Sequence, residues 1–193
     1  MRYLWLPVLL VSLLVVPVSS YADDLADGLK AYDAKDYKRA YELLLPLADK
    51  GNAAAQYRIG VILDAGHGIK PNPAAAVAYY DKAARSGVPA AAFNLGLLYF
   101  DGRGVEKDYA SSVRYFSIAA EQGDVDGQLN LGLMYAAAKG VPRDFEKSFQ
   151  WLFIAADSGS QDASYAIGKF RQVVSPSDVE KGRRLATEWQ RHH

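Results

Sequence analysis

Hydrophobic residues in this chain follow a helical spacing that is interrupted at regular intervals by polar, glycine-bearing turns. The first unit shows it: Leu25, Leu29 and Tyr32 precede a short turn, and Tyr37, Ala40, Leu44 and Leu47 follow it. Apolar residues three or four positions apart are typical of an amphipathic helix. The pattern therefore predicts pairs of helices joined by short turns.

Three sets of residues then recur along the chain with a step of 36. One set is a glycine inside the apolar run, one is a glycine after the second helix, and one is an Asp or Asn before that helix. The sets are Gly60, Gly96, Gly132 and Gly168; Gly51, Gly87, Gly123 and Gly159; and Asp36, Asn72, Asp108 and Asp144. A fixed period shared by three sets indicates a repeat protein in which one helix pair is the unit.

Each set has a physical interpretation. The Asp and Asn residues are predicted N-caps, whose side chains accept from amides of the first helical turn, and Pro73 follows Asn72 where a missing amide is harmless. The glycines after the helix are predicted to adopt the left-handed conformation. A glycine inside a helix costs about 1 kcal/mol relative to Ala. Its recurrence suggests a close helix contact, for which we expect the neighbours Ala83-Ala84, Ala119-Ala120 and Ala155-Ala156.

The marks divide the chain into successive units. Residues 23–52 form a short first pair, with a turn four residues shorter than the others and with Pro46 inside its second helix, where we expect a kink or a loose turn. Full repeats follow at 53–88, 89–124 and 125–160. In their turns Gly68, Gly104 and Gly140 persist while Ala138 replaces a glycine, so we expect the persistent glycines to need an unusual backbone angle.

Residues 161–191 are predicted to close the array. A partial repeat is followed by a polar helix at about 176–190, with Ser175 as its N-cap and Val179, Leu185 and Trp189 as its inner residues. A polar last helix keeps the end of a repeat array in contact with water. Counting this helix, the sequence predicts ten helices in five pairs.

The N-terminus carries a candidate targeting segment. Arg2 precedes an apolar stretch from Leu4 to Val18, and Ser20-Tyr21-Ala22 supplies small residues at the positions that a signal peptidase reads. We expect residues 1–22 to be a signal peptide cleaved after Ala22, which places the protein in the periplasm or outside the cell without a stable membrane span. The alternative is an uncleaved anchor helix.

Composition excludes several classes of function. The 193 residues include 22 Lys plus Arg and 22 Asp plus Glu, so the net charge is zero and nothing favours nucleic-acid binding. The absence of cysteine excludes disulfides, thiolate metal sites and cysteine nucleophiles.

The repeated motif resembles a known family. It reads A-x-[FY]-x-[LI]-G-x-x-Y, then G-x-G-V-x-x-D-[YF], and ends A-A-x-x-G; it matches at 91–123, with a few substitutions at 55–87 and 127–159, and in part at 163–173. It closely resembles the Sel1-like repeat, while the short first pair looks more like a tetratricopeptide repeat. The resemblance implies an all-α fold, a right-handed α-solenoid of about five antiparallel helix pairs. It also implies an adaptor that binds other proteins, because Sel1-like proteins mostly assemble complexes.

The sequence contains no recognisable set of catalytic residues. His67 lies in a turn, His192 and His193 are the last two residues, and the motifs of zinc proteases and serine hydrolases are missing. We therefore expect no enzyme activity, metal or cofactor. Two alternatives stay open: an accessory of an envelope complex such as a motor or secretion assembly, and a β-lactam or cell-wall enzyme like that suggested for cysteine-rich Sel1-like relatives.

What remains is a predicted binding surface. In solenoids of helix pairs the first helix of each pair usually lines the concave face, where an apolar groove suits an extended peptide or a helix. The candidates form two rungs 36 residues apart, with polar residues beside them: Tyr57, Phe93, Leu129 and Tyr165; Val61, Leu97, Leu133 and also Phe100; and Arg58, Asn94 and Asn130. Phe93 and its equivalents have a second interpretation, as core between neighbouring helices.

Overall fold

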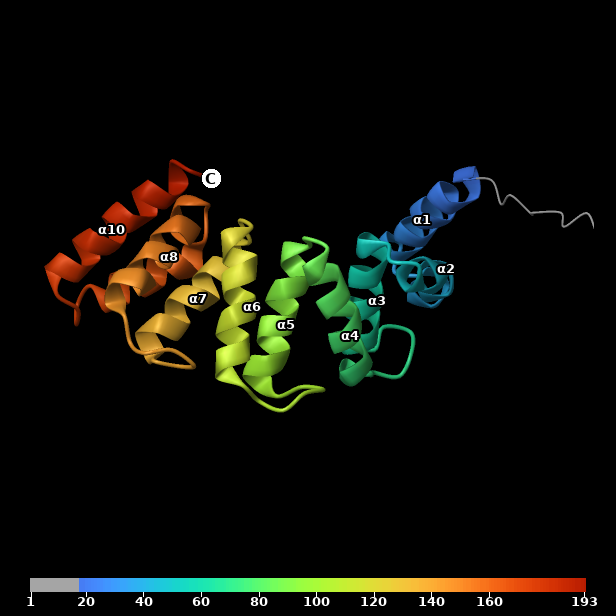
Figure 1. The fold of residues 1–193 in the computed structure, drawn as a ribbon, viewed down its shortest axis with the longest axis horizontal. Coiled ribbons are helices and arrows are strands. Elements are labelled where there is room, and N and C mark those ends of the chain that lie inside the picture. Colours follow the sequence, from blue (N-terminus) through green and yellow to red (C-terminus); the bar gives the residue numbers. More distant parts are fainter. Residues whose placement is uncertain (1–17) are drawn as a thin grey trace, which may run out of the picture.

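The computed structural model describes the backbone of residues 18–193 and the side chains from Asp23 onward; the predicted signal peptide lies outside the part with described side chains. Residues 18–193 contain ten α-helices and no strand, arranged as an elongated row with α1 at one end and α10 at the other (Figure 1). The helices are α1 (Val18–Asp33), α2 (Tyr37–Asp49), α3 (Ala53–Ala65), α4 (Pro73–Arg85), α5 (Pro89–Asp101), α6 (Tyr109–Glu121), α7 (Val125–Ala137), α8 (Phe145–Asp157), α9 (Gln161–Phe170) and α10 (Pro176–Gln190). The predicted all-helical solenoid is confirmed.

The first eight helices form four hairpins in sequence order. We call α1, α3, α5, α7 and α9 the A helices and α2, α4, α6 and α8 the B helices. Each B helix packs against the A helix of its own repeat and against the next A helix. The A helix α3 also contacts its A-helix neighbours α1 and α5, and no comparable contact joins α2, α4 and α6. In this part of the row the A helices therefore lie on the inner side of the curve.

The predicted helix ends are confirmed. Side chains of Asp36, Asn72, Asp108 and Asp144 each accept a hydrogen bond from an amide two or three residues further on, at 2.9–3.2 Å. The glycines that follow the B helices have φ between +81° and +96°, a conformation that costs glycine little. These ends fix the length of every B helix from α4 to α8 at 13 residues.

The glycines inside the A helices do mark close contacts, but the predicted neighbours are wrong. A Cβ on Gly60 would meet the ring of Tyr80, one on Gly96 the ring of Phe116, and one on Gly132 the side chain of Leu152. The alanine pairs are not among these contacts. The glycine leaves room for a large side chain of the B helix in its own repeat, rather than letting two small surfaces meet.

The turns between A and B helices contain two left-handed positions, not one. Gly68, Gly104 and Gly140 have φ of +69° to +72° as predicted, but the preceding glycine position is also left-handed, and Ala138 occupies it with φ +56°. The second position differs because it faces the backbone of the preceding repeat: Gly68 lies on Tyr37 and Lys38, Gly104 on Pro73 and Ala74, and Gly140 on Tyr109 and Ala110. Each turn thus packs on the start of the B helix in the preceding repeat.

The first repeat keeps the same packing with a shorter turn. Only three residues, 34–36, separate α1 from α2, whereas seven separate α3 from α4. Helix α2 continues through Pro46, so the expected loose turn is absent. Pro46 lies in the last turn of α2, so the backbone hydrogen bond that proline cannot donate is lost near the end of the helix.

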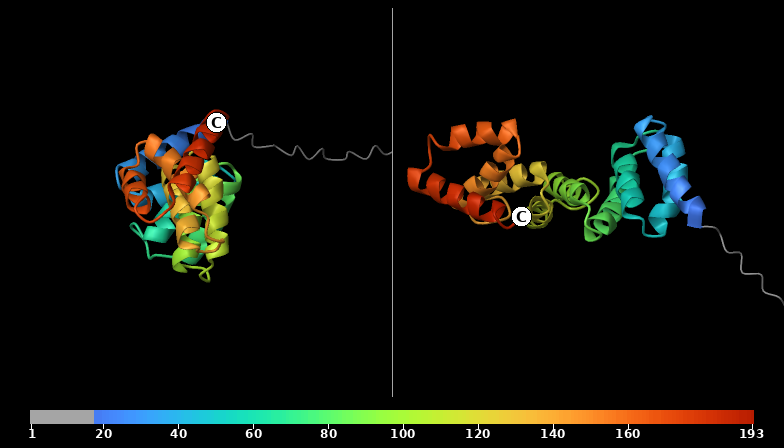
Figure 2. Two further views of the ribbon diagram at one scale, coloured as in Figure 1. Left: turned by 90° about the vertical axis from the view of Figure 1, so that its left-hand side faces the viewer. Right: turned by 90° about the horizontal axis from the view of Figure 1, so that it is seen from above.

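The last two helices do not form a hairpin. Helix α10 packs along α8 and makes little contact with α9, and the two run along different sides of the C-terminal end when seen from above (Figure 2, right). Gly182 of α10 lies on Phe149 of α8, and Lys181 pairs with Glu146 at 2.6 Å. The predicted inner residues Val179, Leu185 and Trp189 are half-buried, and Trp189 meets Trp151 with ring centroids 5.6 Å apart.

The core between the A and B helices consists of two clusters of buried residues, one in the N-terminal and one in the C-terminal half of the row, and Phe93 packs against both. Phe116, Tyr115 and Trp151 of the B helices are buried as predicted. Tyr79 is only half-buried, because its hydroxyl reaches the surface and donates to Asp49 of the preceding repeat at 2.9 Å.

Candidate protein-interaction surface

The predicted ladder residues on helices α3, α5 and α7 are neither fully buried nor freely exposed. They are half-buried and pack against the core with one side: Tyr57, Val61, Phe93, Leu97, Phe100, Leu129 and Leu133. These positions therefore agree in part with both interpretations, as core and as exposed surface, because each side chain packs on the core with one side and remains accessible on the other. Tyr165, the fourth residue of the first rung, is 68% exposed.

Aromatic packing holds the ladder residues in place. The ring of Tyr57 lies 6.1 Å from that of Tyr80, and Phe93 lies 5.8 Å from Phe116, in equivalent positions of successive repeats. Phe100, at the end of α5, packs on Tyr109 at 5.2 Å. Rings fixed in this way keep a constant spacing along the row, which favours recognition of an extended or helical segment over a small molecule.

The polar residues beside the ladder all have partners within the molecule. The Arg58 guanidinium stacks on the ring of Tyr32 at 4.5 Å, the Asn94 side chain is hydrogen-bonded to Tyr80, and Asn130 donates to the Asp126 carbonyl at 2.8 Å. Burial raises the pKa of the Tyr80 hydroxyl, and the hydrogen bond from Asn94 opposes this shift. These residues order the ladder and are poor candidates for the main contacts of a partner.

A second set of contacts links each turn to the preceding repeat, and the sequence did not reveal it. The residue between the two left-handed positions reaches back in every case. His67 stacks on Tyr37 at 4.4 Å, Arg103 pairs with Asp64 at 2.7 Å, and Lys139 lies over the Phe100 ring at 4.7 Å. Positions 67, 103 and 139 lie 36 residues apart in the sequence. Because they hold three different residue types, the sequence did not indicate that they share a role. Lys139 thus adds a cation at the edge of the ladder.

The ladder is hollowed near its C-terminal end. A cavity of about 390 Å³ opens beside the predicted residue Leu133. Apolar side chains supply most of its wall and one guanidinium stands among them; the lining residues are Leu133, Ala136, Ala137, Arg143, Phe145, Phe170 and Val173. Phe170 and Val173 escaped prediction because they follow the point where the repeat pattern ends. An apolar side chain next to an acidic group fits this lining.

Metal binding and membrane insertion were each considered for the described residues. Among the described side chains, no three His, Asp or Glu residues gather where a metal ion would fit. No helix from residue 18 onward combines the length and apolar character that a membrane span requires.

Comparison with known proteins agrees with the repeat structure. The profile of the Sel1 repeat family matches residues 26–52, 53–88, 89–124 and 125–160. The short first pair, whose turn resembles that of a tetratricopeptide repeat, is thus matched as well.

Solved structures resemble the chain over most of its length. A Sel1 repeat protein from Oxalobacter formigenes is 34% identical, with a TM-score of 0.72, over 76% of this chain and 60% of that one. A protective antigen of uropathogenic Escherichia coli strains with an SLR fold is 31% identical, with a TM-score of 0.75, over 89% and 37%. Cysteine-rich protein B of Helicobacter pylori, 24% identical with a TM-score of 0.55, shares the fold.

One curated protein shares a shorter segment. Chitin synthase regulatory factor 3 of Schizosaccharomyces pombe is 41% identical over 54 residues, which are 28% of this chain and 6% of that protein. The chain therefore spans a small part of this relative and less than two thirds of the first two solved structures.

Proposed function

Since this chain belongs to the Sel1 repeat family, we propose that it is an exported, non-catalytic adaptor that binds a protein or peptide through the ladder on its A helices. The observation that carries the proposal is the row of half-buried apolar side chains at equivalent positions of α3, α5 and α7. Isolated apolar residues on a surface are ordinary, but a contiguous row marks an interaction site.

Leu97 and Phe100 form the centre of the proposed site. Both lie on α5, in the middle of the row, and they are one helical turn apart. Leu133 stands one repeat further on and opens into the cavity of about 390 Å³. A partner that runs along the A helices would fill this cavity with an apolar side chain and pass Leu97 and Phe100 with its next contacts.

Export is proposed from the N-terminal sequence alone. The positive residue, the apolar stretch and the small residues ending at Ala22 are the features of a signal peptide. Mass spectrometry of the protein recovered from an envelope fraction tests it. A first residue of Asp23 supports export with cleavage, and an intact N-terminus contradicts it.

A capture experiment tests the adaptor function. The chain is used as bait in an envelope extract beside a Leu97→Arg/Phe100→Glu double variant of equal helicity. A matched control, Ala74→Glu/Ala78→Arg, makes the same charge changes at exposed positions of α4. The proposal expects one protein to be retained by the native and control baits and lost with the double variant. Equal capture by all three baits would exclude the ladder as the site.

An envelope-complex accessory remains the second candidate, and it uses the same surface. The relative from S. pombe is named a regulatory factor of a synthase, which agrees with action through another protein. Identification of the captured protein as part of a motor or secretion assembly distinguishes this candidate.

The enzymatic alternative is tested by hydrolysis of a chromogenic β-lactam by the purified chain, for which we expect no activity.

A further inference from the structure

The fifth A helix lacks the cover that every earlier A helix receives from a B helix. Gly60, Gly96 and Gly132 each lie against a large side chain of their own B helix. Gly168 stands one repeat further along α9, and apart from its chain neighbours and the backbone of α9 itself no atom lies within 4 Å of the place where its Cβ would be. Helix α9 therefore repeats the glycine position but lacks the large B-helix side chain that packs on it in the earlier repeats.

The positions around Gly168 are uncovered as well. Tyr165 and Arg171 are exposed. Their equivalents in the earlier repeats are buried or half-buried, and several of them pack on rings of their own B helix: Tyr57, Phe93 and Leu129; and Leu63, Tyr99 and Tyr135. The free face of α9 is therefore the one that a B helix covers elsewhere in this molecule, and α10 leaves it open by packing on α8.

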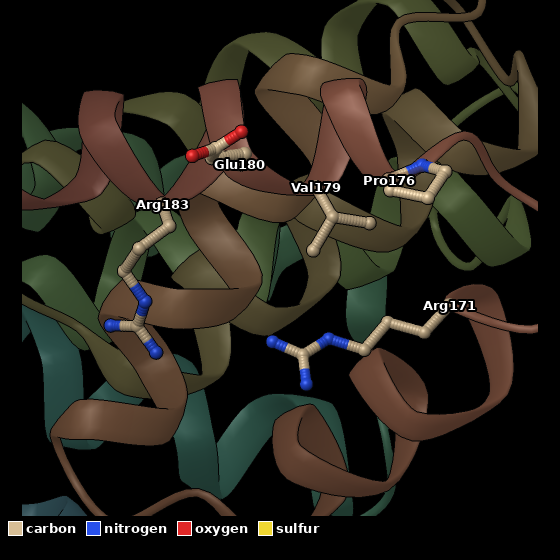
Figure 3. Close-up of a pocket in the computed structure, with 5 residues that line it drawn as sticks. All are labelled: Arg171, Pro176, Val179, Glu180 and Arg183. Carbon is tan, nitrogen blue, oxygen red and sulfur yellow. The ribbon is translucent and has the colours of Figure 1, made fainter.

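A cavity marks the C-terminal part of this face. Between the end of α9 and α10 lies a space of about 520 Å³, lined by Arg171, Pro176, Val179, Glu180 and Arg183 (Figure 3). The two guanidinium groups differ in their contacts. That of Arg183 pairs with Asp157 at 2.6 Å and stacks on Phe153 at 3.7 Å. That of Arg171 lies 5.7 Å from the same ring and forms no ion pair within the described residues. The cavity thus offers a cation to an incoming acid.

We propose that this face binds a helix of another protein, which takes the place of a fifth B helix. The register defines what the helix must present. In the third hairpin Phe116 covers Gly96, and the preceding residue, Tyr115, stacks on Tyr99 at 5.5 Å. Gly168 and Arg171 stand at the positions of Gly96 and Tyr99. The partner helix therefore carries a carboxylate for Arg171, followed directly by a large apolar side chain for Gly168.

A second copy of this chain is a poor occupant. All four of its B helices are already packed between two A helices, so none is free to be donated. End-to-end stacking, with the α1 end of one copy on the α9 face of another, is disfavoured for a different reason. Tyr165 and Val173 are the large apolar residues that the described part exposes, and both belong to this end. From Asp23 onward, the α1 end exposes no large apolar side chain that would match them. The proposal extends the adaptor function to a second surface, at the end of the row.

Two peptides derived from the chain itself test the proposal. Each comprises residues 109–122, the α6 segment, with Tyr115→Glu in one and Tyr115→Lys in the other. Their binding to the full chain is followed by fluorescence anisotropy. We expect the Glu peptide to bind at least fivefold more tightly. Arg171→Glu in the chain should reverse this preference, and Gly168→Leu should abolish binding of both peptides. The control Arg184→Glu, at an exposed position of α10, should leave the preference unchanged.

The outcomes separate this site from the ladder. Equal binding of the two peptides, or a preference that survives Arg171→Glu, would overturn the proposal. A dimer in sedimentation that Gly168→Leu abolishes would overturn the assigned occupant in favour of a second copy. If the peptides fail while the ladder still captures a partner, the adaptor function stands and this site falls. If neither surface binds a partner, both the adaptor function and the site on α9 are contradicted.

Discussion

Gly140, in the turn between α7 and α8, lies directly against the backbone of Tyr109, the first residue of α6 in the preceding repeat. A Cβ at position 140 would also come within 2.8 Å of the amide nitrogen of Ala110. Gly104 has the same relation to Pro73 and Ala74. The turn glycine is therefore an inter-repeat contact as well as a left-handed residue, and it fixes the angle between successive hairpins.

Replacing this glycine should weaken the whole row. Gly140→Ala places a side chain at φ +72°, which costs about 1–2 kcal/mol, and drives it into backbone. Gly159→Ala has φ +96° but opens into free space, so it is a matched control for the conformational part. We expect the free energy of unfolding to fall by about 1–3 kcal/mol more for Gly140→Ala. Urea denaturation followed by circular dichroism measures the difference, and equal losses would show that the contact is unimportant.

Ala138 is the opposite case. It holds φ +56° without glycine, so Ala138→Gly should relieve backbone strain and raise the free energy of unfolding by about 0.5–1 kcal/mol. Ala137→Gly, one residue earlier within helix α7, is expected to lower it by a similar amount. Thermal denaturation of the two variants checks the signs. A loss of stability in Ala138→Gly would mean that the methyl group makes a contact worth more than the strain.

Two glycines that look identical in the sequence should respond differently to alanine. Gly96→Ala pushes a methyl group into the Phe116 ring, and we expect a loss of about 1–3 kcal/mol. Gly168→Ala meets no atom and gains helix propensity, so it should add about 0.5–1 kcal/mol. Chemical denaturation of both variants in the absence of any partner is the measurement. Similar effects at the two positions would contradict the open face on α9.

The sequence predicted the repeats well because capping and left-handed positions are local. Asp108 and Gly123 are determined by their own helix, so their roles were readable from spacing. The side chain that packs on Gly96 could not be predicted, because the sequence does not reveal which side of one helix faces the next. The departure of α10 also depends on distant residues. Phe149 and Phe153 give α8 a larger apolar face than their equivalents Val113 and Ser117 give α6, and α10 covers it.

Alkaline pH should weaken the contact between the first two B helices. Burial, with the hydrogen bond to Asp49, raises the pKa of Tyr79 from 10.0 to about 12. Because the unfolded tyrosine ionises first, stability from this group is full below pH 10 and is lost as the pH rises towards 12. Asp49→Asn removes the carboxylate and should lower the midpoint of the Tyr79 phenolate titration. An unchanged titration in difference spectra against Tyr79→Phe would contradict the assigned cause.

The proposed binding surface was only partly predictable from the sequence. Ladder positions such as Leu97 follow from the period, but their half-buried state depends on how closely the A helices approach one another. Phe170, Val173 and Arg171 lie where the repeat pattern stops, so no register predicted their grouping. The proposed contacts at the end of the row therefore lie where the 36-residue period stops.

Site-specific photo-crosslinking tests the central claim most directly. A photoreactive phenylalanine analogue replaces Phe100 in one variant and Tyr79 in another; both are half-buried aromatic residues, the first on an A helix and the second on a B helix. Both variants are irradiated in the envelope extract and the products identified by mass spectrometry. The adaptor account predicts one protein crosslinked at position 100 and not at 79. Crosslinking at 79 alone, or of the same protein equally from both positions, would contradict it.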